Sequence, residues 1–348
     1  DCTDPATPGC GENGTTTLSV RQSRFGVRGF LPTSLGELRT IFEFDFYGVG
    51  DDAGETTIRL RHAWGELGEF GGGQTNSLFM DGDVFPNTID YWGPIGMVFL
   101  RNPQIRWTPV IIRDERWRTA FALESPGSAI DSGKVGQVDP TLDLDSWNHY
   151  PDFTTQIRFT DSFGHVQLSG IVRGLGVQGV NGVGEDVHDI ELGGGGSLSS
   201  VIQMSEFAQA LAGDQILAQI TYGSGISNYM NDGGTDLGPS QAPPGAQAEV
   251  VSTFACMLYY NRTWSERWTS SIGYSQNDQH PLQGQTDEAF KSGQYFSVNA
   301  LLHPVPQMLV GPEFIWGRRK NKDGDAASDS RIQFSLKYDF GGTLTGGQ

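Results

Sequence analysis

The stretch RIQFSLKYDF, Arg331 to Phe340, alternates apolar and polar side chains without interruption. The apolar positions of this pattern are Ile332, Phe334, Leu336, Tyr338 and Phe340. Successive side chains of a β-strand point to opposite faces, so the alternation predicts a strand with one apolar face and one polar face. Membrane β-barrels are built from such strands, because lipid-facing and lumen-facing residues alternate along their walls.

The same alternation recurs along most of the chain, for example at residues 38–46, 117–123 and 155–160. It predicts about fifteen strands. They are expected to begin near Leu18, Glu37, Thr57, Phe70, Met97, Arg116, Phe153, His165, Asp189, Gln215, Val250, Arg267, Tyr295, Met308 and Arg331.

The connections between these strands alternate in length. PTSLGE, GELGE, PVIIRDE, TDSFG, TWSE and PVPQ are short, whereas long connections cover residues 80–95, 125–151, 227–247 and 277–292. The alternation predicts an all-β fold, a transmembrane up-and-down antiparallel β-barrel with short periplasmic turns and long extracellular loops.

Strand number and strand direction together predict one further element. Bacterial single-chain barrels have an even number of strands, and the phase above makes both the first and the last strand run toward the periplasm. We therefore expect an ascending sixteenth strand, either within residues 1–17 or upstream of Asp1, and we favour the second position. Residues 1–17 are then the remnant of the first extracellular loop, residues 18–340 the barrel and residues 341–348 a C-terminal tail.

Composition excludes some classes of protein and leaves the membrane open. The mean hydropathy of −0.34 suits a barrel as well as a soluble protein, and there is no apolar run of about 18 residues, which a transmembrane helix needs. A net charge of −18 disfavours nucleic acid as a partner. Cys2 and Cys10 are close enough in sequence for a small disulfide loop in an oxidising compartment.

Arginines fall opposite the apolar positions of several predicted strands. In TTIRLRHAW, Arg59 and Arg61 alternate with Ile58 and Leu60. The arginines expected to line the lumen are Arg24, Arg28, Arg39, Arg59, Arg61, Arg106, Arg116, Arg118, Arg158 and Arg173. Fixed cations in a water-filled bore favour anions, and guanidinium groups bind carboxylates bidentately.

Among these arginines, the ones expected to contact anions are Arg59, Arg61, Arg106, Arg116 and Arg118. The alternative is that the arginines pair with lumen acids such as Glu43 and Asp45 and hold the wall together, and both roles can hold for different members. A phase slip near Pro103 leaves the face of Arg101 undetermined. The same phase predicts an outward position for His62 and Trp64.

The long connection after the fourth predicted strand contains FMDGDVFPNTIDYWGPIG, which is unusually aromatic for a solvated loop. We expect residues 80–95 to fold into the bore and narrow it, with Asp81, Asp83 and Asp90 opposite the arginines. Opposed charges would set up a transverse field across the channel. The alternative is a loop that packs on a neighbouring subunit.

No motif indicates an enzyme. GLGVQG, at residues 174–179, matches a dinucleotide fingerprint by letter, but no βαβ unit surrounds it. Acidic loops such as NKDGDAASDS and GEDVHDIE are more typical of solvated loops than of divalent-cation sites. We therefore expect no catalysis, no cofactor and no bound metal.

Three segments carry a family resemblance. RQSRFGVRGFLPTSLGELRTIFEFDFYG, TTIRLRHAWGEL and GQTNSLFMDGDVFPNTIDYWGPIGMVFLRNPQIRWTP resemble the DcaP-like porins of the Gram-negative outer membrane. The resemblance is specific over residues 21–109, and the closing RIQFSLKYDF is similar to the terminal strand of such barrels. It implies a sixteen-stranded homotrimeric barrel, embedded among lipid and lipopolysaccharide, that takes up small anionic solutes such as dicarboxylates. It also implies a first strand and an N-terminal helical extension. The tail GGTLTGGQ departs from the family pattern.

The functional hypothesis is a passive outer-membrane channel for small anions. The alternative is a structural or adhesive barrel whose acidic loops bind cations, lipopolysaccharide or a surface partner.

Overall fold

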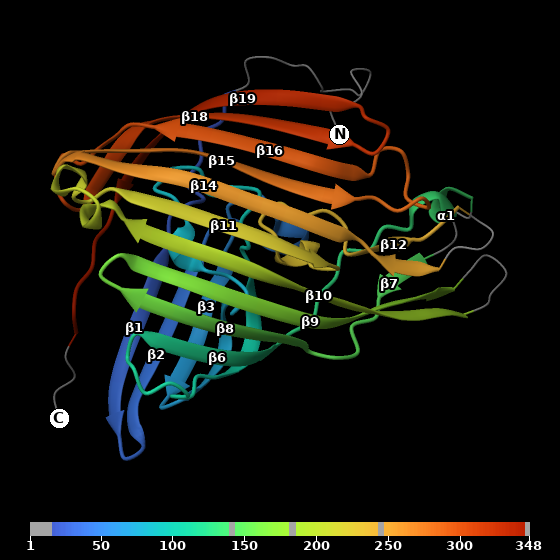
Figure 1. Cartoon of the computed structure of the whole chain (residues 1–348), viewed down its shortest axis with the longest axis horizontal. Helices are drawn as coiled ribbons and strands as arrows, with labels where there is room; N and C mark the ends of the chain where they lie inside the picture. Colours follow the sequence, from blue (N-terminus) through green and yellow to red (C-terminus); the bar gives the residue numbers. More distant parts are fainter. Residues whose placement is uncertain (1–15, 139–142, 181–185, 243–246, 345–348) are drawn as a thin grey trace.

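The computed structural model describes residues 16–138, 143–180, 186–242 and 247–344, and these are almost entirely β-structure (Figure 1). The strands are β1 (Phe25–Thr33), β2 (Gly36–Asp45), β3 (Arg59–Leu67), β4 (Phe70–Asn76), β5 (Arg101–Trp107), β6 (Trp117–Glu124), β7 (Asp143–Ser146), β8 (Asp152–Asp161), β9 (Gly164–Val180), β10 (Asp186–Gln203), β11 (Gln215–Ser224), β12 (Leu237–Pro239), β13 (Ala248–Val250), β14 (Ser252–Ser265), β15 (Trp268–His280), β16 (Phe290–Asn299), β17 (Leu301–Leu302), β18 (Met308–Asn321) and β19 (Ala326–Tyr338). The described helical elements are α1 (Gly133–Val138) and the short 3-10 turns η1 (Gly50–Asp52), η2 (Gly82–Val84), η3 (Met204–Glu206), η4 (Gln209–Leu211) and η5 (Ser227–Tyr229). No helix in the described ranges is long and apolar enough to cross a bilayer.

Seventeen strands belong to one sheet. Each strand of the wall pairs antiparallel with the next, from β1 with β2 through to β18 with β19. Two of the seventeen are not separate strands of the wall: β7 pairs only with the end of β9, and β17 continues β16. The wall therefore consists of fifteen strands in chain order. The predicted all-β, up-and-down architecture is confirmed, and the fifteen expected strand starts each match one strand of the wall.

The two ends of the wall differ in their connections. Residues 34–35, 68–69 and 162–163 are tight turns at one end, whereas residues 77–100 and 225–251 are long segments that leave the other. In Figure 1 the long-loop end, with α1, lies on the right. Short turns face the periplasm in outer-membrane barrels, so the long-loop end is extracellular.

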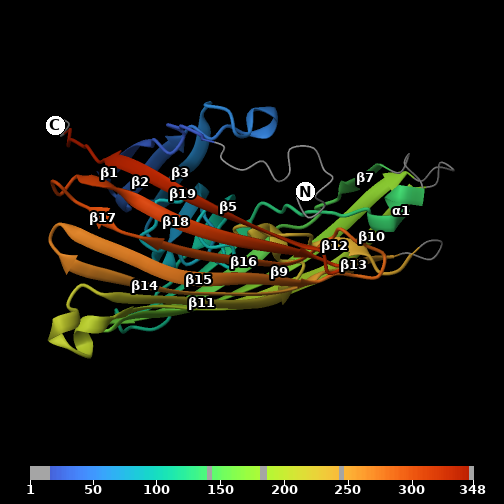
Figure 2. The ribbon, with the colours of Figure 1, turned by 90° about the horizontal axis from the view of Figure 1, so that it is seen from above.

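The sheet curls so that its first and last strands approach each other, as the view from above shows (Figure 2). The ring of Phe25, which begins β1, lies 6.3 Å from the ring of Phe340, which follows β19. Because fifteen antiparallel strands follow one another, β1 and β19 run in the same direction, and they share no ladder among the described residues. The sixteenth strand stays a prediction. Cys2 and Cys10 lie outside the described residues, and Cys256 is a free thiol.

The outer face of the wall is apolar, as the alternation predicted. On β11, Ile220 and Tyr222 are exposed on the outside, whereas Leu217 and Gln219 are buried on the inside. Leu336 of β19 is exposed in the same way. Large apolar side chains without cover are stable at this surface only against lipid or a partner.

The segment 77–100 lies on the inner side of the curved sheet. Its residues hydrogen-bond to β2, β8, β10, β11, β15, β16 and β19, strands that lie on different sides of the wall. Only a segment on the concave side can reach all of them. Phe79, Met80 and Met97 pack there in an apolar cluster with inward residues of the wall such as Leu217 and Met257.

A second extracellular segment, residues 225–251, also enters the interior. Ile226, Tyr229 and Met230 are buried in the same apolar cluster. Glycines make room for this segment: a Cβ at Gly195 would lie 2.7 Å from the carbonyl oxygen of Tyr222 and 3.2 Å from Ile226 Cδ1. The run of glycines inside β10 is therefore a site of close packing.

A β-bulge on β3 corrects one prediction. The register between β2 and β3 shifts between Glu43 and Phe44, so that Arg61 is the extra residue. A bulge of this kind reverses the face of every later side chain on its strand. His62 and Trp64 therefore face inward, not outward: His62 Nδ1 lies 3.0 Å from Thr75 Oγ1, and Trp64 is buried under Arg106.

Candidate functional site

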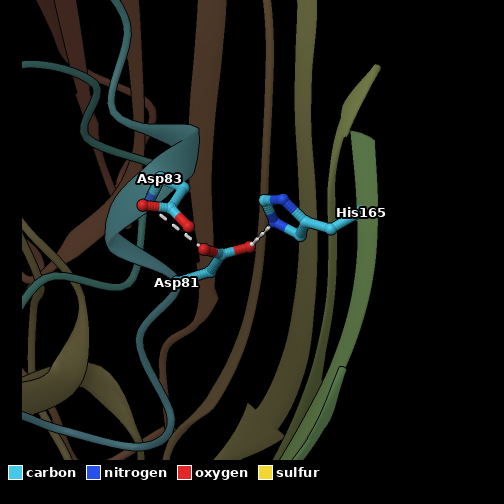
Figure 3. A group of neighbouring side chains, drawn as sticks. All are labelled: Asp81, Asp83 and His165. Atoms are coloured by element: carbon cyan, nitrogen blue, oxygen red, sulfur yellow. Dashed lines mark hydrogen bonds and ion pairs between the residues drawn. The ribbon is translucent and has the colours of Figure 1, made fainter. Parts of the chain in front are cut away.

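The inward segment 77–100 is fastened to the wall at Asp81, where η2 begins. The Asp81 carboxylate is buried and accepts hydrogen bonds from Arg158 Nη2 at 2.5 Å and from Ser199 Oγ at 2.7 Å. His165 Nε2 lies 2.8 Å from the same carboxylate (Figure 3). Burial alone would raise the pKa of Asp81, but the hydrogen bond from His165 and the charge of Arg158 outweigh it and hold the pKa below its usual value.

Asp83 completes this cluster, which we call the Asp81 anchor (Asp81, Asp83, Arg158, His165 and Ser199). Its carboxylate accepts from Arg158 Nη1 at 2.6 Å. Asp81, Asp83 and His165 offer three ligand atoms within 4.8 Å of one another, a spacing that could hold a metal ion. Arg158 already bridges both carboxylates, so a positive charge of the protein itself lies between them.

The far end of the segment is fastened around Asp90. Tyr295 donates to one Asp90 carboxylate oxygen at 2.8 Å, and Arg331 donates to the other at 3.1 Å. The backbone N–H groups of Ile89 and Asp90 donate to the Glu313 carboxylate at 3.0 and 2.9 Å. The two ends of the segment thus bind opposite parts of the wall.

Beyond Asp90, the side chain of Tyr91 reaches β2 and β3. Its hydroxyl donates to Asp45 at 2.7 Å, and it accepts from Arg61 at 2.6 Å and from Arg59. Arg59 and Arg61 both bind the Asp45 carboxylate, and Arg61 also binds Glu43 at 2.6 Å. These two arginines are therefore balanced by two carboxylates.

Two further arginines join this place, which we call the Tyr91 cluster (Glu43, Asp45, Arg24, Arg59, Arg61, Tyr91 and Arg101). The Arg24 guanidinium lies 5.6 Å from the centre of the Tyr91 ring. Arg101 interacts electrostatically with Arg59 and Arg61, and its Nη1 is buried without a hydrogen-bond partner in the described structure. Neither Arg24 nor Arg101 lies within ion-pairing distance of a carboxylate in the described ranges. The cluster has four guanidinium groups and two carboxylates, an excess of two positive charges.

Three more arginines line the open inner face of β1, β5 and β6. Arg106 donates to the carbonyl of Asn76 at 2.7 Å and lies over the ring of Trp64. Arg118 and Arg28 are exposed on the same inner face. Among the described residues, none of the three is within ion-pairing distance of a carboxylate.

The remaining predicted arginines are already engaged. Arg173 is completely buried, where Asp152 and Asp236 bind its guanidinium at 3.0 and 3.3 Å. Arg39 pairs with Glu37 at 2.8 Å near the short-turn end. Arg116 lies in the turn before β6, outside the strand, and pairs with Asp114 and Asp161. These three are in structural ion pairs, the second of the two roles that the sequence left open.

Sequence reasoning missed Arg101, Tyr91 and Tyr229. Arg101 was left aside for its uncertain face, and only the inward segment brings Tyr91 to it. Tyr229 donates to Asp152 at 2.9 Å from within a segment that looked like an ordinary extracellular loop. The apolar residues around Tyr229 in ISNYM were the available signal.

A curled antiparallel sheet with an apolar outside, a charged inside and an inward loop defines an outer-membrane porin. The model of the DcaP outer membrane protein family matches residues 10–195, more than half of the chain, and the chain belongs to this family. It is thus a channel protein of the Gram-negative outer membrane.

Solved structures agree in fold. The outer membrane channel DcaP of Acinetobacter baumannii superposes with a TM-score of 0.78 at 20% identity, over 98% of this chain and 90% of that chain. An anion-selective porin from Comamonas acidovorans gives 0.57 at 9% identity, over 91% and 89%. The trimer form of OmpT of Vibrio cholerae gives 0.51 at 12% identity, over 90% of each chain. No curated protein sequence matched.

Proposed function

We propose that the chain is a passive diffusion channel that favours small anions. The observation that carries the proposal is the set of inner-face arginines without carboxylate partners in the described structure: Arg24, Arg28, Arg101, Arg106 and Arg118. Uncompensated cations along a bore raise the local concentration of anions and lower the barrier to their passage.

The solute passes along the wall formed by β1 to β6. Most apolar side chains of the inward segment pack on β9, β10, β11, β14, β16 and β18, and this packing fills that side of the interior. On the other side, Leu78 packs on Ala120 and Ala122 of β6. The opposite wall keeps exposed polar and cationic side chains on its inner face. We place the path of water and solute on this side, past the arginines.

Dicarboxylates are the solutes that fit the Tyr91 cluster best. The cluster has an excess of two positive charges, and guanidinium groups bind carboxylates through paired hydrogen bonds. A dianion that contacts both Arg24 and Arg101 balances the excess charge.

A homotrimer is the expected assembly. The outer faces of β4, β5 and β6 present neighbouring aromatic rings, with Phe70 stacked 6.4 Å from Trp107 and Trp107 tilted 5.8 Å from Phe121. An aromatic surface of this kind suits contact with a second copy or with lipid. Light scattering of the detergent-solubilised chain measures the assembly, and a monomeric mass contradicts it.

Liposome swelling tests the proposed transport. Vesicles containing the protein should swell faster in succinate than in a neutral solute of similar size, and slower in a small organic cation. Equal rates for the three solutes would remove the anion preference. No swelling at all would favour the structural or adhesive barrel.

A further inference from the structure

The outer face of the wall changes character near the extracellular end of β15, β16 and β18. One row across these strands consists of Tyr274, Phe296 and Trp316, which are register partners in turn. The next outward row is Gln276, Gln294 and Arg318, and the row after it is Asp278, Ser292 and Lys320. An aromatic row followed by polar rows marks the boundary between hydrocarbon and headgroups.

Arg318 and Lys320 face outward, away from the bore. On the same strand, Glu313 and Ile315 are buried on the inner face, and Arg318 and Lys320 fall on the opposite side of the alternation. On the neighbouring strand β16, Gly293 and Tyr295 point inward. Gln294 and Ser292, the register partners of Arg318 and Lys320, therefore point outward as well. These cations therefore take no part in conduction.

The two cations border a hollow. Ser292, Gln294, Arg318 and Lys320 line a groove of about 260 Å³ between β16 and β18. Neither cation lies within ion-pairing distance of a carboxylate in the part of the chain that the structure describes. The nearest acid in these rows, Asp278, lies two strands from Lys320 and accepts a hydrogen bond from Gln276 at 2.5 Å.

We propose that this groove binds the phosphorylated sugar headgroup of lipopolysaccharide, a lipid of the outer leaflet. The guanidinium of Arg318 offers two donors in a fork and the Lys320 ammonium a point charge, the pair of groups that best holds a phosphate. Ser292 and Gln294 supply neutral polar groups for the adjoining sugar. The aromatic row beneath contacts the acyl chains of the same molecule, and this is why a lipid phosphate fits the position better than a free one.

The test compares two double variants of the full-length chain in detergent. R318S/K320S removes the charges that line the groove, and R319S/K291S removes two charges from the same two strands that do not line it. Added lipid A should raise the Tm of the wild type and of R319S/K291S. The lipid A affinity of R318S/K320S should be weaker by roughly 30-fold, because each cation near a membrane surface contributes about 1 kcal/mol and a tenfold change is about 1.4 kcal/mol.

Three outcomes would overturn the assignment. Equal lipid A affinity in both variants and the wild type removes the groove as the site. Equal stabilisation by dephosphorylated lipid A removes the phosphate, and equal stabilisation by inorganic phosphate alone makes the occupant a free ion. Ion selectivity of R318S/K320S should match the wild type, so failure of this inference and failure of the proposed transport are separate results.

Discussion

The two sides of the barrel interior follow the same alternation but differ in what their inner faces contact. Met257 and Tyr259 of β14 are buried against the inward segment, in an apolar cluster. Arg118 of β6 and Arg28 of β1 are exposed on their inner faces. We call the first side the filled wall (β9 to β18) and the second the open wall (β1 to β6). The alternation tells which residues point inward, but the inward segment decides which of them a solute can reach.

The difference also separates two uses of arginine. On β8 and on β9 of the filled wall, Arg158 and Arg173 bind carboxylates and hold segments in place. On the open wall, several arginines have no acidic partner in the described structure, and these are the charges that we propose attract the solute. Ion pairs therefore occur on both sides of the lumen, as for Arg59 and Arg61 of β3, but the predicted arginines without a carboxylate partner in the described ranges lie on the side of the open wall.

The largest expected effect on stability comes from Asp81→Asn. This substitution breaks the anchor that holds the inward segment against the wall. Loss of one partner of a buried ion pair costs about 3 kcal/mol, and Arg158 would lose its main partner. We expect a lower Tm in detergent and a noisier open-channel current in planar bilayers.

The pH dependence sharpens the same prediction. Because the pKa of Asp81 is lowered in the fold, its contribution to stability persists above the ordinary carboxyl pKa of about 3.9 and is lost as the pH falls below it. The difference in Tm between wild type and D81N should therefore be as large at pH 5 as at pH 7. A difference that vanishes at pH 5 would contradict the anchor.

Met257→Ala probes the filled wall without touching charge. Truncating this buried side chain should cost about 2 kcal/mol, measured as a lower Tm. The reversal potential in a KCl gradient should stay at the wild-type value, since Met257 packs under the inward segment and away from the solute. A changed reversal potential would mean that this side is not filled.

Arg118→Gln probes the open wall and should give the reverse pattern. Removing one charge about 10 Å from the path changes the energy of a passing monovalent anion by about 0.4 kcal/mol in water, which is about twofold in relative permeability. The Tm should hardly move, because Arg118 has no ion pair in the described ranges.

Arg116→Gln should have the smallest effect on the current. Arg116 is exposed in a turn at the short-turn end, where Asp114 and Asp161 bind it. Selectivity should match the wild type in the same KCl gradient. If it fell as far as in R118Q, the turn would have to lie on the solute path.

The sequence predicted the wall well because alternation is a local property. The starts of β4, β11 and β18 fall on the predicted residues, Phe70, Gln215 and Met308. The bulge at Arg61 was not visible, since an extra residue leaves no compositional mark, and it reversed the faces of His62 and Trp64. Strands with regular pairing can be predicted from the sequence, whereas β-bulges, which interrupt the alternation, cannot.

The site was predictable as a set of residue types but not as a set of partners. The aromatic composition of residues 80–95 predicted an inward path for this loop, and the alternation predicted which arginines face the bore. Arg173 is enclosed partly by Asp236, which lies 63 residues away along the chain. Arg101 belongs to the Tyr91 cluster only because the inward segment places Tyr91 beside it. Such contacts are set by tertiary folding, which spacing along the sequence does not specify.

The most direct test of the account is the reversal potential of Arg24→Gln/Arg101→Gln in a KCl gradient across a planar bilayer. This variant removes the excess charge of the Tyr91 cluster, whereas the control D45N/R59Q removes one charge of each sign. We expect an anion-preferring potential for the wild type and the control, and a clearly smaller one for R24Q/R101Q, in which Arg28, Arg106 and Arg118 keep their charge. A potential for R24Q/R101Q equal to the wild-type value would contradict the claim that uncompensated arginines on the open wall set the selectivity.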